Sequence, residues 1–212
     1  LAQIKVAVSD GELFDEEIFQ LNILPVNDAP TLVTVGSQQT SEDIPISVNL
    51  YGNDIDGDIL TFNAESGGEE VLVLVDGNQL TLTPVENWYG SISISIAVSD
   101  GNLTDSDIFT LNVLPVNDAP VLTEIGTNTT NEDNSLLIEL SAYDIDEDEL
   151  IFSSESYNAN VSVSIDGNQL TLTPSQDYNG LAQIKVAVSD GELFDEEILQ
   201  LNILPVNDAP TL

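Results

Sequence analysis

The sequence contains no cysteine and no histidine, and its only basic residues are Lys5 and Lys185. Without cysteine, a disulfide framework and thiolate metal sites are excluded. Without histidine, imidazole ligands and the commonest general base are excluded as well. A metal ion bound by this chain must therefore be held by oxygen atoms.

Positive charge is scarce. The chain has 38 acidic residues against two basic ones, and its formal net charge is −36 at pH 7. Such a surface repels phosphate groups, so nucleic acid and anionic membranes are poor partners. There is no run of 18 apolar residues and no charged, then apolar, leader at the start, so we expect no membrane-spanning or targeting segment in these residues.

One short phrase, "LPVNDAP", occurs three times, with its first proline at positions 25, 115 and 205. The spacing is 90 residues both times, and "SDG", "DID" and "DGNQLTLTP" recur with the same step. A fixed period of this kind is typical of an array of repeats. We expect the C-terminal hairpin of a truncated preceding repeat at 1–30, one repeat at 31–120, a second at 121–210, and the start of a further repeat at 211–212.

Alternation of apolar and polar residues predicts strands along each repeat. The segment "SISISIAV" at 91–98 places isoleucine on one face and serine on the other. About seven such segments fill a repeat, separated by turn formers such as "GNDIDGD" and "SDGN", and no helical period competes. The predicted fold class is therefore all-β, with tandem seven-stranded Greek-key sandwiches of immunoglobulin type joined end to end.

Residues 1–30 hold only the last two strands of a repeat. They match residues 181–210 except that Phe19 corresponds to Leu199. A lone two-stranded hairpin is marginal in water. We therefore expect this segment to fray, or to replace residues 181–210 of a neighbouring molecule and give a strand-swapped homodimer.

Two aromatic segments precede the long sixth strand, "PVENWYG" at 84–90 and "PSQDYNG" at 174–180. We interpret them as corners in which Tyr89 or Tyr178 packs its ring inward; the alternative is an exposed aromatic platform for a sugar ring. If Trp88-Tyr89 of the first repeat corresponds to Asp177-Tyr178 of the second, Trp88 corresponds to Asp177. The fold should then not require Trp88. Trp88 is then the one candidate for a sugar platform.

Acidic residues gather in the same loops of both repeats, at "SED", "DID", "SDG" and "VND". In a sandwich, the loops after the second and sixth strands lie at the end that faces the entering linker, and the loop before the second strand lies at the opposite end. One junction should therefore combine Glu42 of one repeat, Asn117 and Asp118 of the linker, and Asp144, Asp146 and Asp190 of the next repeat. The preceding linker and repeat supply Asn27, Asp28, Asp54, Asp56 and Asp100.

These oxygen-rich loops indicate a hard cation, and a flexible multidentate set favours Ca²⁺ over Mg²⁺. At ~5 Å and an effective dielectric constant of about 20, each pair of like charges costs roughly 3 kcal/mol, so a junction without a cation should splay and a loaded one should stiffen. Pro115 and Pro120 further restrict the linker. The alternative is that these are turn residues made acidic for solubility.

The same motifs resemble the cadherin-like tandem repeats of large bacterial surface and secreted adhesins, of the RTX and biofilm-associated type. Glu42 in "TSEDIPISVNL" is similar to the glutamate near the start of a cadherin unit, and Asp100 in "AVSDG" to the Asp of its AxDxG motif. "NDIDGD" resembles the family's DxD, and "PVNDAP" its linker. The resemblance implies Ca²⁺ between consecutive repeats. The family's Asp-Arg-Glu motif is missing from "VDGNQLTL", which implies one or two ions per junction rather than three.

The resulting functional prediction is a calcium-stiffened spacer in an extracellular, cell-surface adhesin, with calcium and neighbouring repeats as partners. The alternative is that the repeats themselves recognise carbohydrate or other cells. An enzyme is not expected. Paired carboxylates such as Asp54 and Asp56 could serve a glycoside hydrolase, but they recur at each repeat end without a catalytic His, Cys or Gly-x-Ser-x-Gly element.

Overall fold

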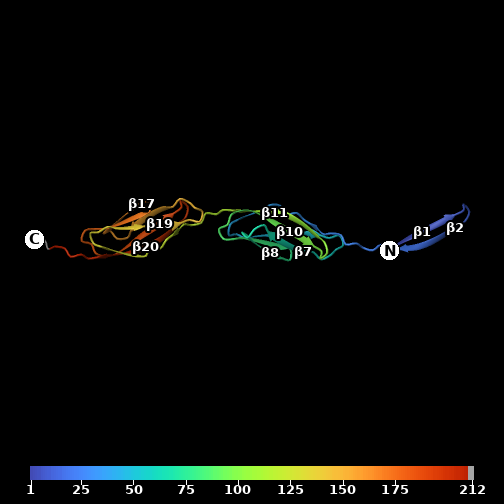
Figure 1. Ribbon diagram of the computed structural model, residues 1–212, viewed down its shortest axis with the longest axis horizontal. Coiled ribbons are helices and arrows are strands. Elements are labelled where there is room, and N and C mark those ends of the chain that lie inside the picture. Colours follow the sequence, from blue (N-terminus) through green and yellow to red (C-terminus); the bar gives the residue numbers. More distant parts are fainter. Residues whose placement is uncertain (210–212) are drawn as a thin grey trace. The chain divides into compact units, whose positions relative to one another are not determined.

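The computed structural model describes residues 1–209, so the predicted start of a further repeat at 211–212 lies outside the described residues. The chain divides into two compact units, Leu1–Pro115 and Val116–Leu212. Within residues 1–209 every regular element is a β-strand (Figure 1), and a helix capable of crossing a membrane is not found there. The all-β prediction is confirmed.

The first unit contains a hairpin followed by a sandwich. The hairpin pairs β1 (Ala2–Ser9) with β2 (Phe14–Leu21). The sandwich has one layer in the order β4-β11-β10-β7, a second in the order β5-β9-β8, and a short β3-β6 pair. Its strands are β3 (Thr31–Leu32), β4 (Gln38–Ser41), β5 (Ile46–Asn49), β6 (Gly52–Asn53), β7 (Thr61–Ser66), β8 (Val71–Asp76), β9 (Gln79–Pro84), β10 (Gly90–Ser99) and β11 (Thr104–Leu114).

The second unit repeats this sandwich. Its layers are β13-β20-β19-β16 and β14-β18-β17, with a short β12-β15 pair. The strands are β12 (Val121–Leu122), β13 (Thr127–Asn131), β14 (Leu136–Glu139), β15 (Ala142–Tyr143), β16 (Ile151–Ser156), β17 (Val161–Asp166), β18 (Gln169–Pro174), β19 (Gly180–Ser189) and β20 (Phe194–Leu204). The first two strands of each sandwich are interrupted and change pairing partner, which reconciles the labelled segments with the seven strands predicted.

Alternation along the strands builds the core between the layers. In β10, Ile94 and Ile96 are fully buried, whereas the serines between them face away from the core. They pack with leucines of β9 and β11, and the same positions form the core of the second unit. Burial of about 25 cal/mol per Å² of apolar surface makes this interlayer contact the main stabilising term of each sandwich.

The aromatic corners differ from the prediction. The 90-residue period aligns Trp88 with Tyr178 and Tyr89 with Asn179, so the pairing predicted from the sequence is wrong by one residue. Trp88 packs against the first core, as Tyr178 does against the second. The Tyr178 hydroxyl accepts from Asn158 Nδ2 at 2.6 Å and donates to the Leu181 carbonyl at 3.4 Å. Trp88 is thus part of the fold, and Tyr89, which is 53% exposed, is not packed inward.

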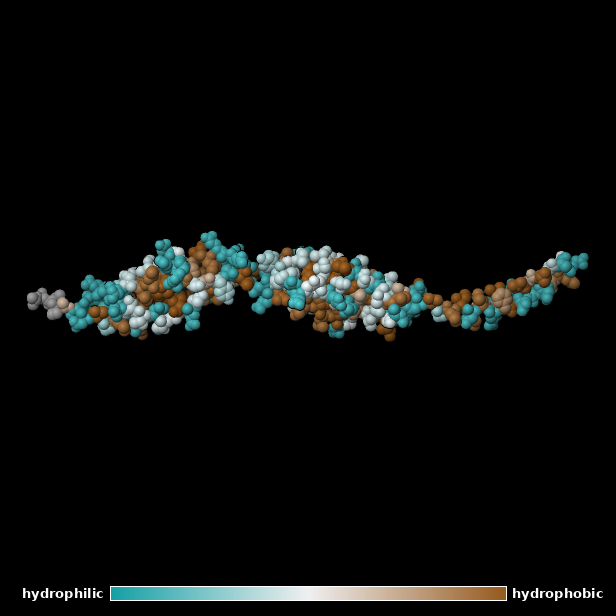
Figure 2. All heavy atoms as spheres, viewed as in Figure 1, coloured by the Kyte–Doolittle hydropathy of each residue, from teal (hydrophilic) through white to brown (hydrophobic). Residues whose placement is uncertain are grey.

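The hairpin β1-β2 lacks the second layer that covers its counterparts. All of its strand residues are exposed, including apolar side chains that are buried at the equivalent positions of both sandwiches. Figure 2 shows apolar residues along this segment.

Equivalent leucines allow burial to be tested directly. Leu21, Leu111 and Leu201 occupy the same repeat position, but Leu21 is 43% exposed and the other two are fully buried. We expect Leu111→Ala to lower the free energy of unfolding of the first sandwich by about 2 to 5 kcal/mol, because it leaves a cavity. Urea unfolding followed by the fluorescence of Trp88, the single tryptophan, measures this. Leu21→Ala is the matched control and should change the value by less than about 0.5 kcal/mol.

Candidate metal centre

The loop after β6 is organised by one carboxylate. Asp54 Oδ1 accepts hydrogen bonds from the backbone N–H groups of Asp56, Gly57 and Asp58, at 2.9, 3.0 and 3.3 Å. The loop curls so that one oxygen of each of the three aspartates lies within 4.8 Å of the others. The second oxygen, Asp54 Oδ2, is buried and has no hydrogen-bond partner among the described residues.

The second unit repeats this loop after β15. Asp144 Oδ1 accepts from the N–H groups of Asp146 and Asp148, at 2.9 and 3.4 Å, and Asp144 Oδ2 is buried without a hydrogen-bond partner in the described chain. The three carboxylates again lie within 4.8 Å of one another. Glu147 takes the left-handed conformation, with φ 63°, where the first unit has Gly57 with φ 81°. Two repeats with different residues therefore adopt the same loop.

Asp58 and Asp148 are members of these clusters that the sequence-based prediction missed. Both continue the alternation of acids in "DIDGD" and "DIDED", so the sequence pattern could have identified them as members of the clusters. The prediction included two acids of each loop because the DxD motif that the loop resembles has two. The folded loop turns that third carboxylate back towards the first two.

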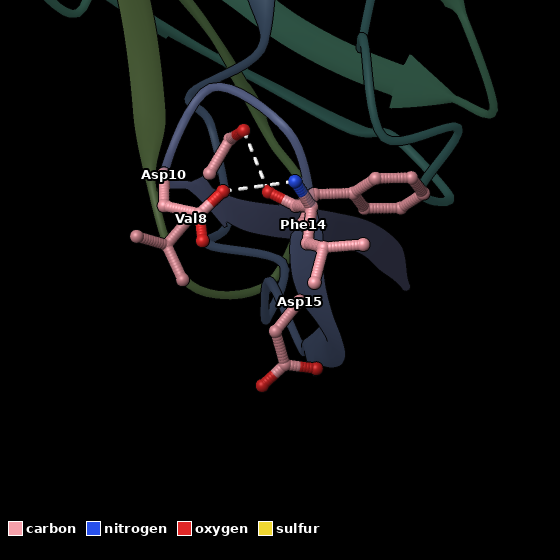
Figure 3. A pocket seen from close by; sticks show the side chains of 6 residues that line it. Val8, Asp10, Phe14 and Asp15 are labelled. Carbon is pink, nitrogen blue, oxygen red and sulfur yellow. Dashed lines mark hydrogen bonds between the residues drawn. The ribbon is translucent and has the colours of Figure 1, made fainter.

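The second acidic loop, "SDG", is a self-contained turn. In the hairpin, Ser9 Oγ donates to the Leu13 carbonyl at 2.7 Å, and Asp10 Oδ1 accepts from Leu13 N at 2.8 Å (Figure 3). The turn after β10 has the same bonds, with Asp100 Oδ1 accepting from Asn102 and Leu103. Because one oxygen of the aspartate is used within the turn, the other remains for a different partner.

That partner is the linker that enters the unit. Asn27 Nδ2 donates to Asp100 Oδ2 at 2.8 Å, and the backbone N–H of Asp28 donates to Asp56 Oδ2 at 2.8 Å. The second unit has the same two bonds, from Asn117 to Asp190 at 2.9 Å and from Asp118 to Asp146 at 2.8 Å. The structure thus brings together Asn27, Asp28, Asp54, Asp56 and Asp100 in the first unit, and Asn117, Asp118, Asp144, Asp146 and Asp190 in the second.

Within its own sandwich, Glu42 lies at the end opposite the Asp54 loop. Its backbone N–H donates to the carbonyl of Leu114, the last residue of β11, at 2.9 Å. The equivalent Glu132 is 4% exposed, and its carboxylate accepts from Val206 N at 2.6 Å and from Asn179 Nδ2 at 3.0 Å. A glutamate at this position is therefore fixed by the chain that leaves the sandwich.

Hydrogen bonds keep several of these acids ionised. The Leu103 and Asn102 N–H groups, followed by the Asn27 amide, hold the pKa of Asp100 below its usual value. The Asn117 amide is the main cause of the lowered pKa of Asp190. The backbone of Val206, followed by Asn179, lowers the pKa of Glu132. All three are anionic at neutral pH and can act as ligands without losing a proton.

A further acidic group lies at the C-terminal end of the second sandwich. Oxygens of Asp133, Asp177 and Asp208 lie within 4.8 Å of one another. Desolvation raises the pKa of Asp177, and the charges of Asp208 and Asp133 raise it further. The first repeat has the neutral Asn87 at this position. The two repeats therefore carry different charge at equivalent ends.

Comparison with protein families gives two matches. Residues 116–204 match the cadherin-like domain. The bacterial Ig domain matches residues 27–112. Together the two matches cover both sandwiches, one each, and agree with the predicted resemblance to cadherin-like repeats. They do not distinguish the RTX or biofilm-associated type. No curated protein matches the chain.

Solved structures with similar folds include cadherins. The first two extracellular domains of human protocadherin-24 align with a TM-score of 0.55 at 20% identity, over 87% of this chain and 100% of that one. Domains 1–5 of protocadherin gamma B2 align with the same TM-score and identity, over 98% of this chain and 46% of that one. At this identity the likeness shows the cadherin-like sandwich fold alone.

An enzyme is also among the similar structures. An endo-fucoidan hydrolase of glycoside hydrolase family 107 aligns with 97% of this chain, at a TM-score of 0.38 and 18% identity. The chain spans about a third of that protein's length, 34%. Likeness at this score supports no inference about activity. Cadherin-like and Ig-like domains are typically non-enzymatic adhesion modules.

The cadherin-like loops fit an oxygen-bound cation. A buried carboxylate oxygen without a donor is costly unless a positive charge faces it, and Asp54 Oδ2 and Asp144 Oδ2 are such atoms within residues 1–209. The donor set is entirely oxygen, which suits Ca²⁺. The amides of Asn27 and Asn117 can rotate to turn Oδ1 instead of Nδ2 towards the site.

The raised pKa of Asp177 leads to a stability prediction. The pKa of the Asp177 carboxyl is higher in the folded state than in the unfolded state. Below its unfolded-state pKa the group does not destabilise the fold, but as pH rises through the folded-state pKa the group ionises and the free energy of unfolding falls. We therefore expect Asp177→Asn to raise the melting temperature of the second sandwich at pH 7 in calcium-free buffer. The difference should vanish below about pH 3.9, where the carboxyl is protonated in both states.

The first sandwich offers the reciprocal control. Asn87→Asp places a carboxylate next to Asp43, whose Oδ1 accepts the Asn87 backbone N–H at 3.0 Å. This substitution should lower the melting temperature of the first sandwich under the same conditions. Equal melting temperatures for Asp177→Asn and the unaltered chain at pH 7 would contradict the electrostatic explanation.

Proposed function

We propose that the chain is part of the spacer of an extracellular bacterial adhesin, in which Ca²⁺ bound where each linker enters a repeat stiffens the array. The observation that supports it most strongly is a pair of buried oxygens, Asp54 Oδ2 and Asp144 Oδ2, which have no hydrogen-bond partner within residues 1–209 and each lie in a cluster of three carboxylates. Turn preference alone accounts for aspartate in these loops, but not for a buried oxygen that no donor satisfies.

The proposed ligands come from two loops and one linker per repeat. In the second repeat they are Asn117, Asp118, Asp144, Asp146 and Asp190, and we include Asp148 because its carboxylate lies in the same cluster. In the first they are Asn27, Asp28, Asp54, Asp56 and Asp100, and we include Asp58 for the same reason. Glu42 is proposed to complete the set of the repeat that follows it, as the sequence predicts. Bound Ca²⁺ would supply the positive charge that these carboxylates lack.

The stiffening follows from charge balance. Without a cation, the linker is tied to its repeat by few hydrogen bonds, while neighbouring carboxylates repel one another. With a cation, the same carboxylates become attractive to one centre, and the linker is fixed to both acidic loops. The prolines on either side of Asn117-Asp118 limit the conformations available to the ion-free state.

Partners and location follow from the same proposal. Cadherin-like and bacterial Ig domains are typical of extracellular or surface proteins, and we place this chain on a bacterial cell surface, with calcium and neighbouring repeats as partners. A strand-swapped homodimer through residues 1–30 stays a prediction, supported by the exposure of the hairpin. Recognition of surface glycans has less support, because Trp88, its one candidate, packs against the core.

Calcium should change both shape and stability. We expect addition of millimolar Ca²⁺ to raise the melting temperature and to lengthen the maximum dimension measured by small-angle X-ray scattering, because ion binding stabilises the folded state in proportion to the occupancy of the site. Chelation should reverse both changes. If chelation leaves the maximum dimension and the melting temperature unaltered, the spacer mechanism fails.

Single substitutions test the ligands themselves. Asp144→Asn removes the charge of the buried oxygen while the loop can keep its shape, and we expect about a tenfold or larger rise in the dissociation constant of one Ca²⁺ site. Isothermal titration calorimetry measures this value. The control is Asp166→Asn, which makes the same chemical change at the exposed last residue of β17 and should bind Ca²⁺ like the unaltered chain.

A further inference from the structure

The strand β8 is an unpaired edge of the first sandwich. It pairs with β9 on one side, and within residues 1–209 no strand pairs with its other side. Asp76 and Gln79 face each other across a two-residue turn, so the alternate residues Val73 and Val75 direct their N–H and C=O groups away from β9. Such a row of backbone donors and acceptors can pair with an added strand.

Two leucines extend from this edge into solvent. Leu72 and Leu74 are 66% and 64% exposed, on the outer face of their layer. Figure 2 shows apolar surface at the lower margin of the first sandwich, where Figure 1 shows β8. The edge strands β4, β5 and β7 carry polar residues at their exposed positions. Among the edge strands of these two layers, as far as the structure describes them, β8 alone joins free backbone groups to an apolar surface.

Acidic residues lie at both ends of the strand. Glu69 and Glu70 precede it and Asp76 is its last residue, and all three are exposed. The five residues between Glu70 and Asp76 carry no charge and include neither lysine nor proline, with which natural edge strands block pairing. An apolar edge with negative charge at each end favours a partner with an apolar centre and positive ends.

The second sandwich has the same strand without these features. The corresponding edge is β17, and its sequence "VSVSID" places Ser162 and Ser164 where the first sandwich has the two leucines. Ala159 and Asn160 stand in place of the two glutamates. Because the same fold forms with either set of side chains, the fold does not require the leucines and glutamates of the first repeat.

We propose that β8 binds an extended, cationic peptide segment of a partner protein, which adds as a further strand to the layer β5-β9-β8. The free backbone groups of β8 supply the hydrogen bonds, and Leu72 and Leu74 pack against apolar side chains of the added strand. The flanking acids attract lysine or arginine at its ends. This binding activity goes beyond the proposed spacer function and does not depend on calcium.

Charge disfavours a second copy of this chain as the partner. An antiparallel pair of two β8 strands that places Leu72 of one copy opposite Leu74 of the other also places Glu70 opposite Asp76 at both ends. Like charges directly opposite each other are destabilising, and each copy carries a formal net charge of −36. A cationic segment meets the same acids with opposite charge.

A synthetic peptide tests the site in the full chain. The probe has alternating valine and threonine in its centre, two lysines at each end and a fluorescent label, and its binding is measured by fluorescence anisotropy at 0.15 M salt, where the Debye length is about 8 Å. Leu72→Ser combined with Leu74→Ser gives this edge the serines of β17 and should weaken binding at least tenfold without a change in net charge. Because both leucines are exposed, the circular dichroism spectrum should stay unchanged.

Two further arms separate charge from backbone pairing. Glu69→Gln combined with Glu70→Gln should weaken binding at least threefold. Glu124→Gln combined with Glu139→Gln is the matched control, which removes the same charge from exposed positions of the second sandwich and should leave binding unchanged. A probe with N-methyl groups on its central residues lacks the backbone donors and should bind at least tenfold more weakly to the unaltered chain.

The second sandwich allows a gain of binding to be tested. Ala159→Glu, Asn160→Glu, Ser162→Leu and Ser164→Leu together transfer the four side chains to β17 and should double the number of peptides bound per chain. Equal binding by the leucine variant, or of the N-methylated probe, would show a general attraction to negative charge and overturn the proposal. A dimer in sedimentation equilibrium that the leucine substitutions abolish would also overturn it, because a second copy would then cover the edge.

Discussion

The candidate site depends on the different roles of the two carboxylate oxygens of each loop aspartate. One carboxylate oxygen of Asp54, Asp100, Asp144 or Asp190 accepts backbone N–H groups and shapes its own loop, and the other is left for a linker or a cation. The loops are therefore formed before any ion arrives, and the linker reaches them through a side-chain amide and a backbone N–H. An alanine in these positions would remove both the loop and the ligand.

Local hydrogen bonds also explain why the hairpin β1-β2 forms. The "SDG" turn and the cross-strand ladder of β1-β2 are complete within residues 1–24, because their hydrogen bonds are local. What the hairpin lacks is a second layer. Alternating apolar residues require an opposing sheet to be buried. In the second sandwich the equivalents of Asp15 and Glu17, Asp195 and Glu197, accept from the backbone N–H groups of Leu122, Ile125 and Gly126. A segment can thus have correct secondary structure and still be incomplete.

Repeats with the same fold can also have different ends. Asp177 and Asn179 stand where the first repeat has Asn87 and Tyr89, so the chain that leaves the second sandwich passes a more acidic surface. Glu147 stands where the first repeat has Gly57, and the loop keeps its conformation because hydrogen bonds to Asp144 hold it. The two repeats share one fold, while the residues at their ends give them different charge.

The sequence alone determined the repeat period, the strands and the loops in which the acids gather, because alternation and turn preference are local properties. It also predicted which residues of two loops and a linker come together within each unit. The tertiary structure decided what depends on distant segments. Trp88 packs on a core, Asp58 and Asp148 turn back towards their clusters, and Glu197 accepts from the backbone N–H groups of Ile125 and Gly126. Burial and hydrogen-bond partners at these positions are set by chain far away in sequence, which no local pattern encodes.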